Sequence, residues 1–180
     1  PRPWAPRSWP TRPQAGGWSS TFARVVNKSF FLATVALLAV ACGNTSIFQA
    51  DVEVPDGKWA RAWQPEFTFE IADSISGHDV HIDLRHTGDY AFSDLYLFVT
   101  VTGPGLPLAR DTVQCLLADP TGRWYGSGMG YIKSAHVLYK LNKRFPRNGR
   151  YSIRLEQGMR EEPLTGVIDV GIGVEKAQQG

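Results

Sequence analysis

The histidines and carboxylates between residues 78 and 89 are the side chains best suited to binding a metal ion. This segment contains three histidines and three aspartates: His78, His81, His86, Asp79, Asp83 and Asp89. A metal site needs at least three converging ligands. Side chains alternate between the faces of a β-strand, so Asp79, His81 and Asp83 would share one face and His86 the other. One imidazole and two carboxylates in a row are more typical of a solvated strand face, and we predict no metal site.

The glycine-rich segment 124–130 (WYGSGMG) is the second candidate, because glycines allow backbone NH groups to approach a phosphate. It matches neither GxGxxG nor GxxxxGK[ST], and no helical periodicity follows it. Ser127 also lacks the G-x-S-x-G frame of a nucleophile elbow. We expect a hairpin loop here. Since no Ser/His/Asp or Cys/His set can be placed elsewhere, we predict no enzymatic activity and no cofactor.

Aromatic side chains could form a platform for a sugar or a peptide strand. The candidates for exposed aromatics are Trp59, Trp63, Tyr96, Phe98, Trp124 and Tyr125. The alternative is that they close the ends of a β-sandwich or belong to protein interfaces.

Basic side chains are densest between residues 140 and 154. The cluster consists of Lys140, Lys143, Arg144, Arg147, Arg150 and Arg154. It could contact anionic lipid head groups or an acidic partner. The alternative is a charged strand face that keeps the protein soluble.

Cys42 lies in surroundings that predict one covalent modification. Arg24 and Lys28 precede a largely apolar run of about a dozen residues, FFLATVALLAVA (30–41). A membrane-spanning helix needs ~20 such residues, so the run favours a signal peptide, with a buried apolar helix as the alternative. The sequence LAVAC (38–42) resembles a bacterial lipobox, although alanine stands where leucine is usual three positions before the cysteine.

A lipobox cysteine receives a diacylglyceryl group on its thiol and becomes the first residue after cleavage. We therefore predict a lipoprotein signal peptide over 28–41, lipidation of Cys42, and a lipidated tether over 42–53. A multiply acylated N-terminus anchors stably, because each buried CH₂ adds ~0.8 kcal/mol. Acylation of Cys42 leaves Cys115 without a disulfide partner, so we predict that Cys115 is a small buried apolar residue.

The charge of the chain is divided unevenly along its length. The formal net charge is +2, but residues 1–42 contain five cations and no acid, which leaves −3 for residues 43–180. Nucleic-acid binding calls for a strongly basic domain, so we expect no nucleic-acid partner. Residues 1–27 are rich in proline and tryptophan, and we interpret them as sequence upstream of the true translation start. A basic, proline-rich interaction tail is the alternative.

From residue 54 the chain is organised by alternation of apolar and polar residues, the pattern of half-buried β-strands. Seven such runs occupy residues 67–71, 80–85, 95–102, 113–117, 137–142, 151–156 and 168–174, with a possible eighth near Trp59. One buried face per strand requires a second sheet to cover it. The sequence therefore predicts an all-β, antiparallel β-sandwich of seven to eight strands over 54–176, Ig-like or jelly-roll-like.

Several segments together resemble the GldH family of gliding motility lipoproteins of the Bacteroidetes. They are VPDGKW (54–59), LRHTGDYAFSDLYLFVTVTGP (84–104), RDTVQCLLADPTGRWYGSGMGYI (110–132) and VLYKLNKRFPRNGRYSIRLEQGMREEPLTGVIDVGIGVEK (137–176). The resemblance implies an outer-membrane lipoprotein, a non-enzymatic structural or assembly component of a gliding machinery associated with type IX secretion. It implies protein partners from that machinery and no small-molecule substrate. Only Cys42 carries a family role over to this sequence.

The residues after Cys42 bear on which face of the membrane the protein occupies. Surface-exported lipoproteins of these bacteria usually have acidic residues there, whereas Gly43-Asn44-Thr45-Ser46 is uncharged. The resemblance therefore favours the periplasmic face. The alternative function is a carbohydrate- or ligand-binding lipoprotein, suggested by the sandwich pattern and the aromatic residues.

Overall fold

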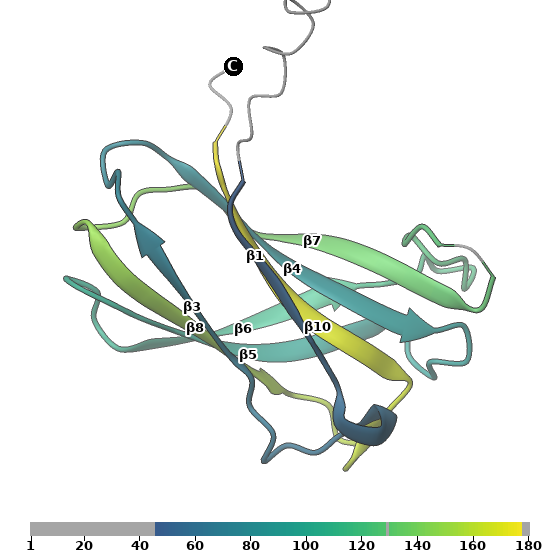
Figure 1. The fold of residues 1–180 in the computed structure, drawn as a ribbon. Coiled ribbons are helices and arrows are strands. Elements are labelled where there is room, and N and C mark those ends of the chain that lie inside the picture. Colours follow the sequence, from purple (N-terminus) through teal and green to yellow (C-terminus); the bar gives the residue numbers. More distant parts are fainter. Residues whose placement is uncertain (1–45, 129, 178–180) are drawn as a thin grey trace, which may run out of the picture. The chain divides into compact units, whose positions relative to one another are not determined.

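The computed structural model describes residues 46–128 and 130–177, which form ten strands joined by turns (Figure 1). The elements in chain order are β1 (Ser46–Glu53), the 3-10 turn η2 (Pro55–Gly57), β2 (Lys58–Trp59), β3 (Glu66–Ile71), β4 (His78–Thr87), β5 (Asp94–Thr102), β6 (Ala109–Leu116), β7 (Ile132–Lys143), β8 (Gly149–Gln157), β9 (Leu164–Thr165) and β10 (Val167–Lys176). They form two four-stranded sheets, β1-β10-β4-β7 and β3-β8-β5-β6, and a small pair β2-β9. All the strand pairs are antiparallel. The prediction of an antiparallel β-sandwich is confirmed.

The core lies between the two four-stranded sheets because their strands alternate as the sequence predicts. In β3 the side chains of Phe67, Phe69 and Ile71 are buried, while the residues between them are exposed. The same alternation buries Ile153 and Leu155 in β8. Burying an apolar side chain of this size contributes about 1.5–3 kcal/mol. The two inward faces therefore supply most of the energy that holds the sheets together.

The predicted tether over 42–53 is wrong for Ser46–Glu53, which form the edge strand β1. This strand pairs with β10 along nearly its whole length. Its alternation is weak in the sequence because only Phe48 and Ala50 pack against the core, and only partly. The other strand absent from the prediction, β9, has two residues and leaves almost no periodic signal. The remainder of the tether lies outside the described residues.

Three loops lie along the left side of the sandwich in Figure 1, and the described chain ends near the uppermost of them. The loops connect β3 to β4 (72–77), β5 to β6 (103–108) and β7 to β8 (144–148). The strand register places Ser46 opposite Glu175, so β1 begins beside the end of β10. We call these three loops the three-loop surface.

Tyr151 fixes two of these loops to each other. Its side chain is fully buried, and its hydroxyl lies 2.7 Å from the carbonyl oxygen of Arg147 and 3.0 Å from that of Pro104. The backbone NH of Arg147 donates to the same hydroxyl at 3.3 Å. Gly103 allows this arrangement, because a Cβ there would lie 2.1 Å from Cδ1 of the Tyr151 ring. Two aromatic residues thus connect these loops to the core: Tyr151 bonds the second and third loops, and Phe145 of the third loop is itself buried against Phe69.

Candidate functional site

Only one of the two cysteines, Cys115, belongs to the residues that the structure describes. Cys42, the predicted lipidation site, lies outside the described residues together with the predicted signal peptide. Cys115 is fully buried on β6, and burial raises the pKa of its thiol to about 12. Cys115 is therefore the small buried apolar residue that the sequence predicts, and its thiolate is suppressed at neutral pH.

The histidine and carboxylate residues of β4 point to the two faces as predicted. Asp79, His81 and Asp83 face outward, and His86 is buried. A fourth histidine, His136 on β7, joins the outward row: its Nδ1 is hydrogen-bonded to Oδ1 of Asp83. Its ring stacks on that of His81 with 4.0 Å between the centroids. Within residues 46–128 and 130–177, no group of three such side chains is placed to hold a metal ion.

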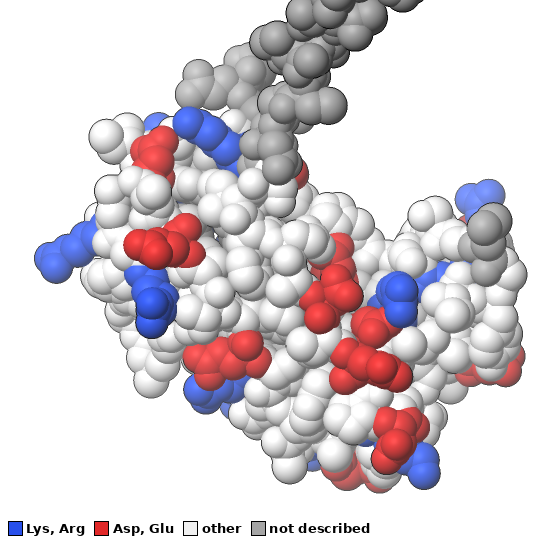
Figure 2. Space-filling model, viewed as in Figure 1, with Lys and Arg blue, Asp and Glu red and all other residues white. Residues whose placement is uncertain are grey.

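The outward row belongs to a face that is rich in carboxylates. Figure 2 shows acidic side chains gathered over β1, β10 and β4. Gln49 of β1 donates to Oδ2 of Asp83 at 2.7 Å, and Arg85 pairs with Asp169. Asp83 is thus reached from β1 across β10, and Asp169 of β10 is paired with Arg85 of the neighbouring β4, as on the solvated polar face that the sequence favours.

The imidazole of His86 is buried near the C-terminal end of β4. Its Nδ1 lies 2.8 Å from the carbonyl oxygen of Thr87, while its Nε2 is buried without a hydrogen-bond partner in the described part of the chain. The ring of Trp124 covers it, with 4.5 Å between centroids. Burial lowers the pKa of the His86 imidazole. This histidine therefore acts as a core side chain that tolerates a proton poorly.

The glycine-rich segment 124–130 belongs to the loop between β6 and β7. Its backbone runs back along the start of β7, where Ser127 forms a bridge with Ser134. A Cβ at Gly126 would lie 2.5 Å from the carbonyl oxygen of Ser134, and one at Gly128 would lie 2.2 Å from that of Ile132. Glycine at these two positions thus allows the loop backbone to pack closely against the backbone of β7.

The predicted group of exposed aromatics is wrong for several of its members. Trp59 is fully buried, and its indole NH donates to the carbonyl oxygen of Trp63 at 3.0 Å. Trp124 is half-buried over His86, and Phe98 lies under the guanidinium of Arg110. Trp59 and Trp124 fill the end of the sandwich away from the three-loop surface, which is the alternative that the sequence left open.

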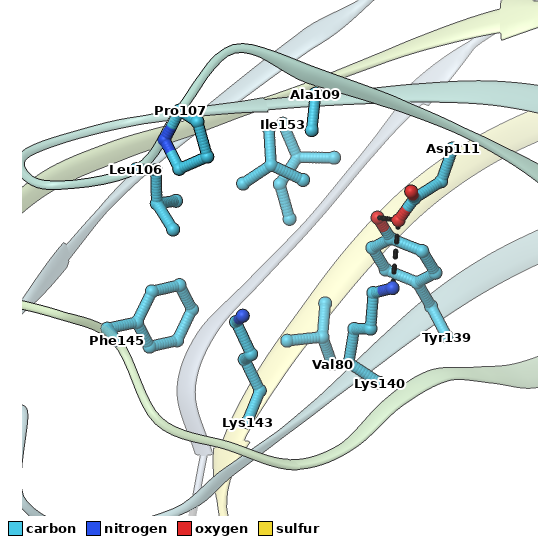
Figure 3. A pocket seen from close by; sticks show the side chains of 11 residues that line it. Val80, Leu106, Pro107, Ala109, Asp111, Tyr139, Lys140, Lys143, Phe145 and Ile153 are labelled. Carbon is cyan, nitrogen blue, oxygen red and sulfur yellow. Dashed lines mark hydrogen bonds and ion pairs between the residues drawn. The ribbon is translucent and has the colours of Figure 1, made fainter.

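A cleft opens between β6 and β7, where the two sheets present their free edges (Figure 3). Its volume is about 260 Å³, slightly below the range of common ligand sites. The lining is mainly apolar and comes from both sheets: Val80, Val101, Leu106, Pro107, Ala109, Asp111, Tyr139, Lys140, Lys143, Phe145 and Ile153. The cleft is suited to an apolar side chain or a short acyl chain.

Polar groups close one side of this cleft. The Tyr139 hydroxyl donates to Oδ2 of Asp111 at 2.7 Å, and Nζ of Lys140 lies 2.8 Å from the same oxygen. The Lys140 ammonium holds the pKa of the Asp111 carboxyl below its ordinary value. Burial and the bond to Asp111 raise the pKa of the Tyr139 phenol. Lys143 stands between Phe145 and Val80, and its ammonium points into the space between the lining side chains (Figure 3). An anionic group in the cleft would find a cation there.

The structure divides the basic cluster into two parts. Lys140 pairs with Asp111, and Arg154 pairs with Glu66 at 2.9 Å. The other four members have no ion-pair partner in the part of the chain that the structure describes: Lys143, Arg144, Arg147 and Arg150. They lie at or beside the turn from β7 to β8, next to the three-loop surface.

Sequence reasoning did not find the cleft or the contribution of His136. The cleft depends on the edges of two sheets meeting, and its walls come from segments more than 50 residues apart. The spacing within any one segment gives no sign of it. The pairing of Asp83 with His136 depends on the register of β4 against β7. The alternation of β7 gives only the face on which His136 lies.

Comparison with known proteins gives one consistent result. A family model described as GldH lipoprotein matches residues 46–174. A gliding motility lipoprotein GldH homolog of Christiangramia forsetii is 27% identical over 154 residues, covering 82% of this chain and 93% of the relative. The gliding motility lipoprotein GldH of Flavobacterium johnsoniae is 27% identical over 158 residues, covering 84% of this chain and 98% of the relative. No solved structure matches the chain.

The matched region coincides with the described fold. It begins at Ser46, where β1 begins, and ends within β10. None of the helical turns in residues 46–128 and 130–177 is long and apolar enough to cross a bilayer. Because the GldH family model matches more than half of the chain, this protein belongs to the GldH lipoprotein family.

Proposed function

We propose that this protein is a lipid-anchored, non-enzymatic component of a gliding motility machinery, held at the outer membrane through acylated Cys42. The match to the GldH family over residues 46–174 carries the proposal. The relatives from Christiangramia forsetii and Flavobacterium johnsoniae are both named as gliding motility lipoproteins. The LAVAC sequence at 38–42 supports the anchor. The uncharged residues after Cys42 favour the periplasmic face.

The free edges of β6 and β7 support a role in docking protein partners of the gliding and type IX secretion machinery. Both strands end their sheets, so their outer backbone groups can pair with a strand from another protein. Apolar side chains are exposed along them, namely Leu116 on β6 and Leu138 and Leu141 on β7. A partner strand would cover these leucines and place a side chain in the cleft.

Deletion and complementation in the native bacterium test this function. Loss of the gene is expected to abolish surface spreading and to reduce type IX export, and the wild-type gene is expected to restore both. Cys42→Ser is expected to be found outside the membrane fraction and to fail to complement. If the deletion strain spreads and exports normally, the proposal is wrong.

The anchor itself is tested by mass spectrometry of the protein extracted from membranes. We expect an N-terminal Cys42 that carries a diacylglyceryl thioether. A chain that begins at Pro1 and carries no lipid would contradict the anchor.

Ligand binding is the second candidate function, and the cleft favours it. Tyr139 and Phe145 line a mainly apolar volume, and Lys143 adds a cation to its lining. A thermal-shift screen with glycans and with short-chain fatty acids separates the two classes of ligand. Stabilisation that disappears in Phe145→Ala would support a ligand site in the cleft, and a screen without any shift would remove this candidate.

A further inference from the structure

The three-loop surface lies where the chain enters the domain. Ser46 pairs with Glu175, and the backbone NH of Ala177 donates to the carbonyl oxygen of Gly77 at 2.9 Å. Three residues lie between Cys42 and Ser46, and the four residue-to-residue steps from one to the other reach at most ~14 Å. An anchor on Cys42 therefore keeps this end of the sandwich close to the membrane.

The most exposed apolar side chains of this end belong to two of its loops. Ile75 in the first loop is 85% exposed and Leu108 in the second is 83% exposed. Isolated exposed apolar residues are common on proteins. These two residues lie on the two loops that the third loop joins, and a lipid interface can cover both.

The charge of the three-loop surface is basic where it is exposed. Arg144 and Arg147 are both exposed in the third loop and have no ion-pair partner among the described residues. The one carboxylate of the three loops, Asp73, is occupied: it accepts hydrogen bonds from Ser76 and lies 3.4 Å from Nζ of Lys176. Guanidinium groups bind phosphate oxygens in bidentate geometry.

The far end of the sandwich carries exposed charges of both signs in its turns. The carboxylates of Asp56, Asp89 and Glu162 stand there together with the cations of Lys58, Arg61 and Arg160, and Arg61 pairs with Glu162. An anionic bilayer attracts Lys and Arg and repels carboxylates within a Debye length. The unpaired arginines of the three-loop surface, compared with the mixed charges of the far end, therefore favour an orientation with this surface toward an anionic membrane.

The three loops are held as one surface. Asn148 Oδ1 accepts a hydrogen bond from the backbone NH of Ser74 at 2.8 Å, which joins the first loop to the third. Tyr151 joins the third loop to the second. The loops that carry Ile75, Leu108 and the two arginines are thus held in a fixed arrangement, so little conformational entropy is lost when they meet a membrane.

We propose that the three-loop surface is a membrane-contact surface that docks on anionic phospholipids, with Ile75 and Leu108 entering the interface and Arg144 and Arg147 on the phosphates. This inference rests on the anchoring of the chain at Cys42. It adds an orientation: β1 runs away from the bilayer, and the far end of the sandwich, with β2 and β9, faces the aqueous space.

Fluorescence depth measurements on the full lipoprotein test the proposal. The protein, produced in a host that acylates it, is reconstituted into phosphatidylcholine vesicles with or without phosphatidylglycerol. An environment-sensitive dye is placed on Ile75→Cys, on Leu108→Cys, or on the matched control Lys58→Cys at the far end. Cys115 is buried with a raised thiol pKa, so it competes poorly for the dye. Flotation of the vesicles reports anchoring separately.

We expect lipid-embedded quenchers to reduce the signal at residues 75 and 108 in vesicles with phosphatidylglycerol, and to leave residue 58 unchanged. Combining Arg144→Gln with Arg147→Gln should lower the docking equilibrium constant about thirtyfold, which corresponds to about 1 kcal/mol for each arginine. Both side chains are exposed, so folding should be unaffected, which circular dichroism checks.

The outcomes separate the surface from the anchor. Protein that floats with the vesicles but shows no quenching at residues 75 and 108, or equal quenching at residue 58, overturns the membrane-contact surface and leaves the anchor intact. Quenching that is unchanged by the two glutamines overturns the role of the arginines and, with it, the proposal. Protein that does not float contradicts the anchor and the orientation built on it.

Discussion

Replacing Tyr151 by phenylalanine removes one oxygen atom and should loosen the three-loop surface without opening a cavity. The hydroxyl bonds the carbonyl oxygens of Arg147 and Pro104 and the backbone NH of Arg147. Leaving part-buried groups without partners costs about 1–2 kcal/mol. For a domain of this size, that loss corresponds to a fall in Tm of roughly 4–7 °C.

Thermal unfolding followed by circular dichroism gives the Tm, and hydrogen exchange at the Arg147 amide reports the loop itself. Tyr125→Phe is the matched control, because Tyr125 is exposed and its hydroxyl makes no hydrogen bond with the described residues. Such a surface change should stay within about 0.5 kcal/mol. Equal Tm values for the two variants, with unchanged exchange at Arg147, would refute the role given to the Tyr151 hydroxyl.

Three further predictions follow from buried or crowded groups. Gly103→Ala should lower stability by roughly 1–3 kcal/mol in denaturant titrations, because its Cβ would meet the Tyr151 ring at 2.1 Å; unchanged stability would mean that the loop moves freely. Because burial lowers the pKa of His86, the unfolded state binds a proton at this imidazole more readily than the folded state does. The free energy of unfolding should therefore be unaffected by His86 above about pH 6.5 and should fall at lower pH by at most ~1.4 kcal/mol per pH unit. His86→Phe should reduce this slope. Asp111→Asn should lower the pKa at which Tyr139 ionises, measured by ultraviolet difference spectra, but only in part, since burial is the larger cause; an unchanged titration would contradict the hydrogen bond.

The sequence predicts the sandwich well because its central strands have one buried and one exposed face. Phe67, Phe69 and Ile71 are buried in the alternating order that their spacing indicates. The sequence predicts β1 poorly because most side chains of this strand are exposed and its apolar alternation is weak. An edge strand is defined by backbone hydrogen bonds to its neighbour, and these leave little trace in side-chain type.

Features of the candidate sites could be predicted only where the alternation within a single strand determines the face on which each side chain lies. The separation of His81 from His86 follows from the period of β4. The partnership of Asp83 with His136 and the walls of the cleft require the order and register of the sheets. Trp59 was expected at the surface, but the pairing of β2 with β9 turns it into the core.

The antiparallel pairing of β1 with β10 determines how the domain would respond to mechanical tension. A force that enters at Ser46 along the axis of β1 runs parallel to the strand and perpendicular to its inter-strand hydrogen bonds. All of these bonds then share the tension, as in a shear joint. A sideways force at the same residue would instead break them one after another, like a zipper. A protein pulled away from its anchor along this axis is therefore attached in the stronger of the two geometries.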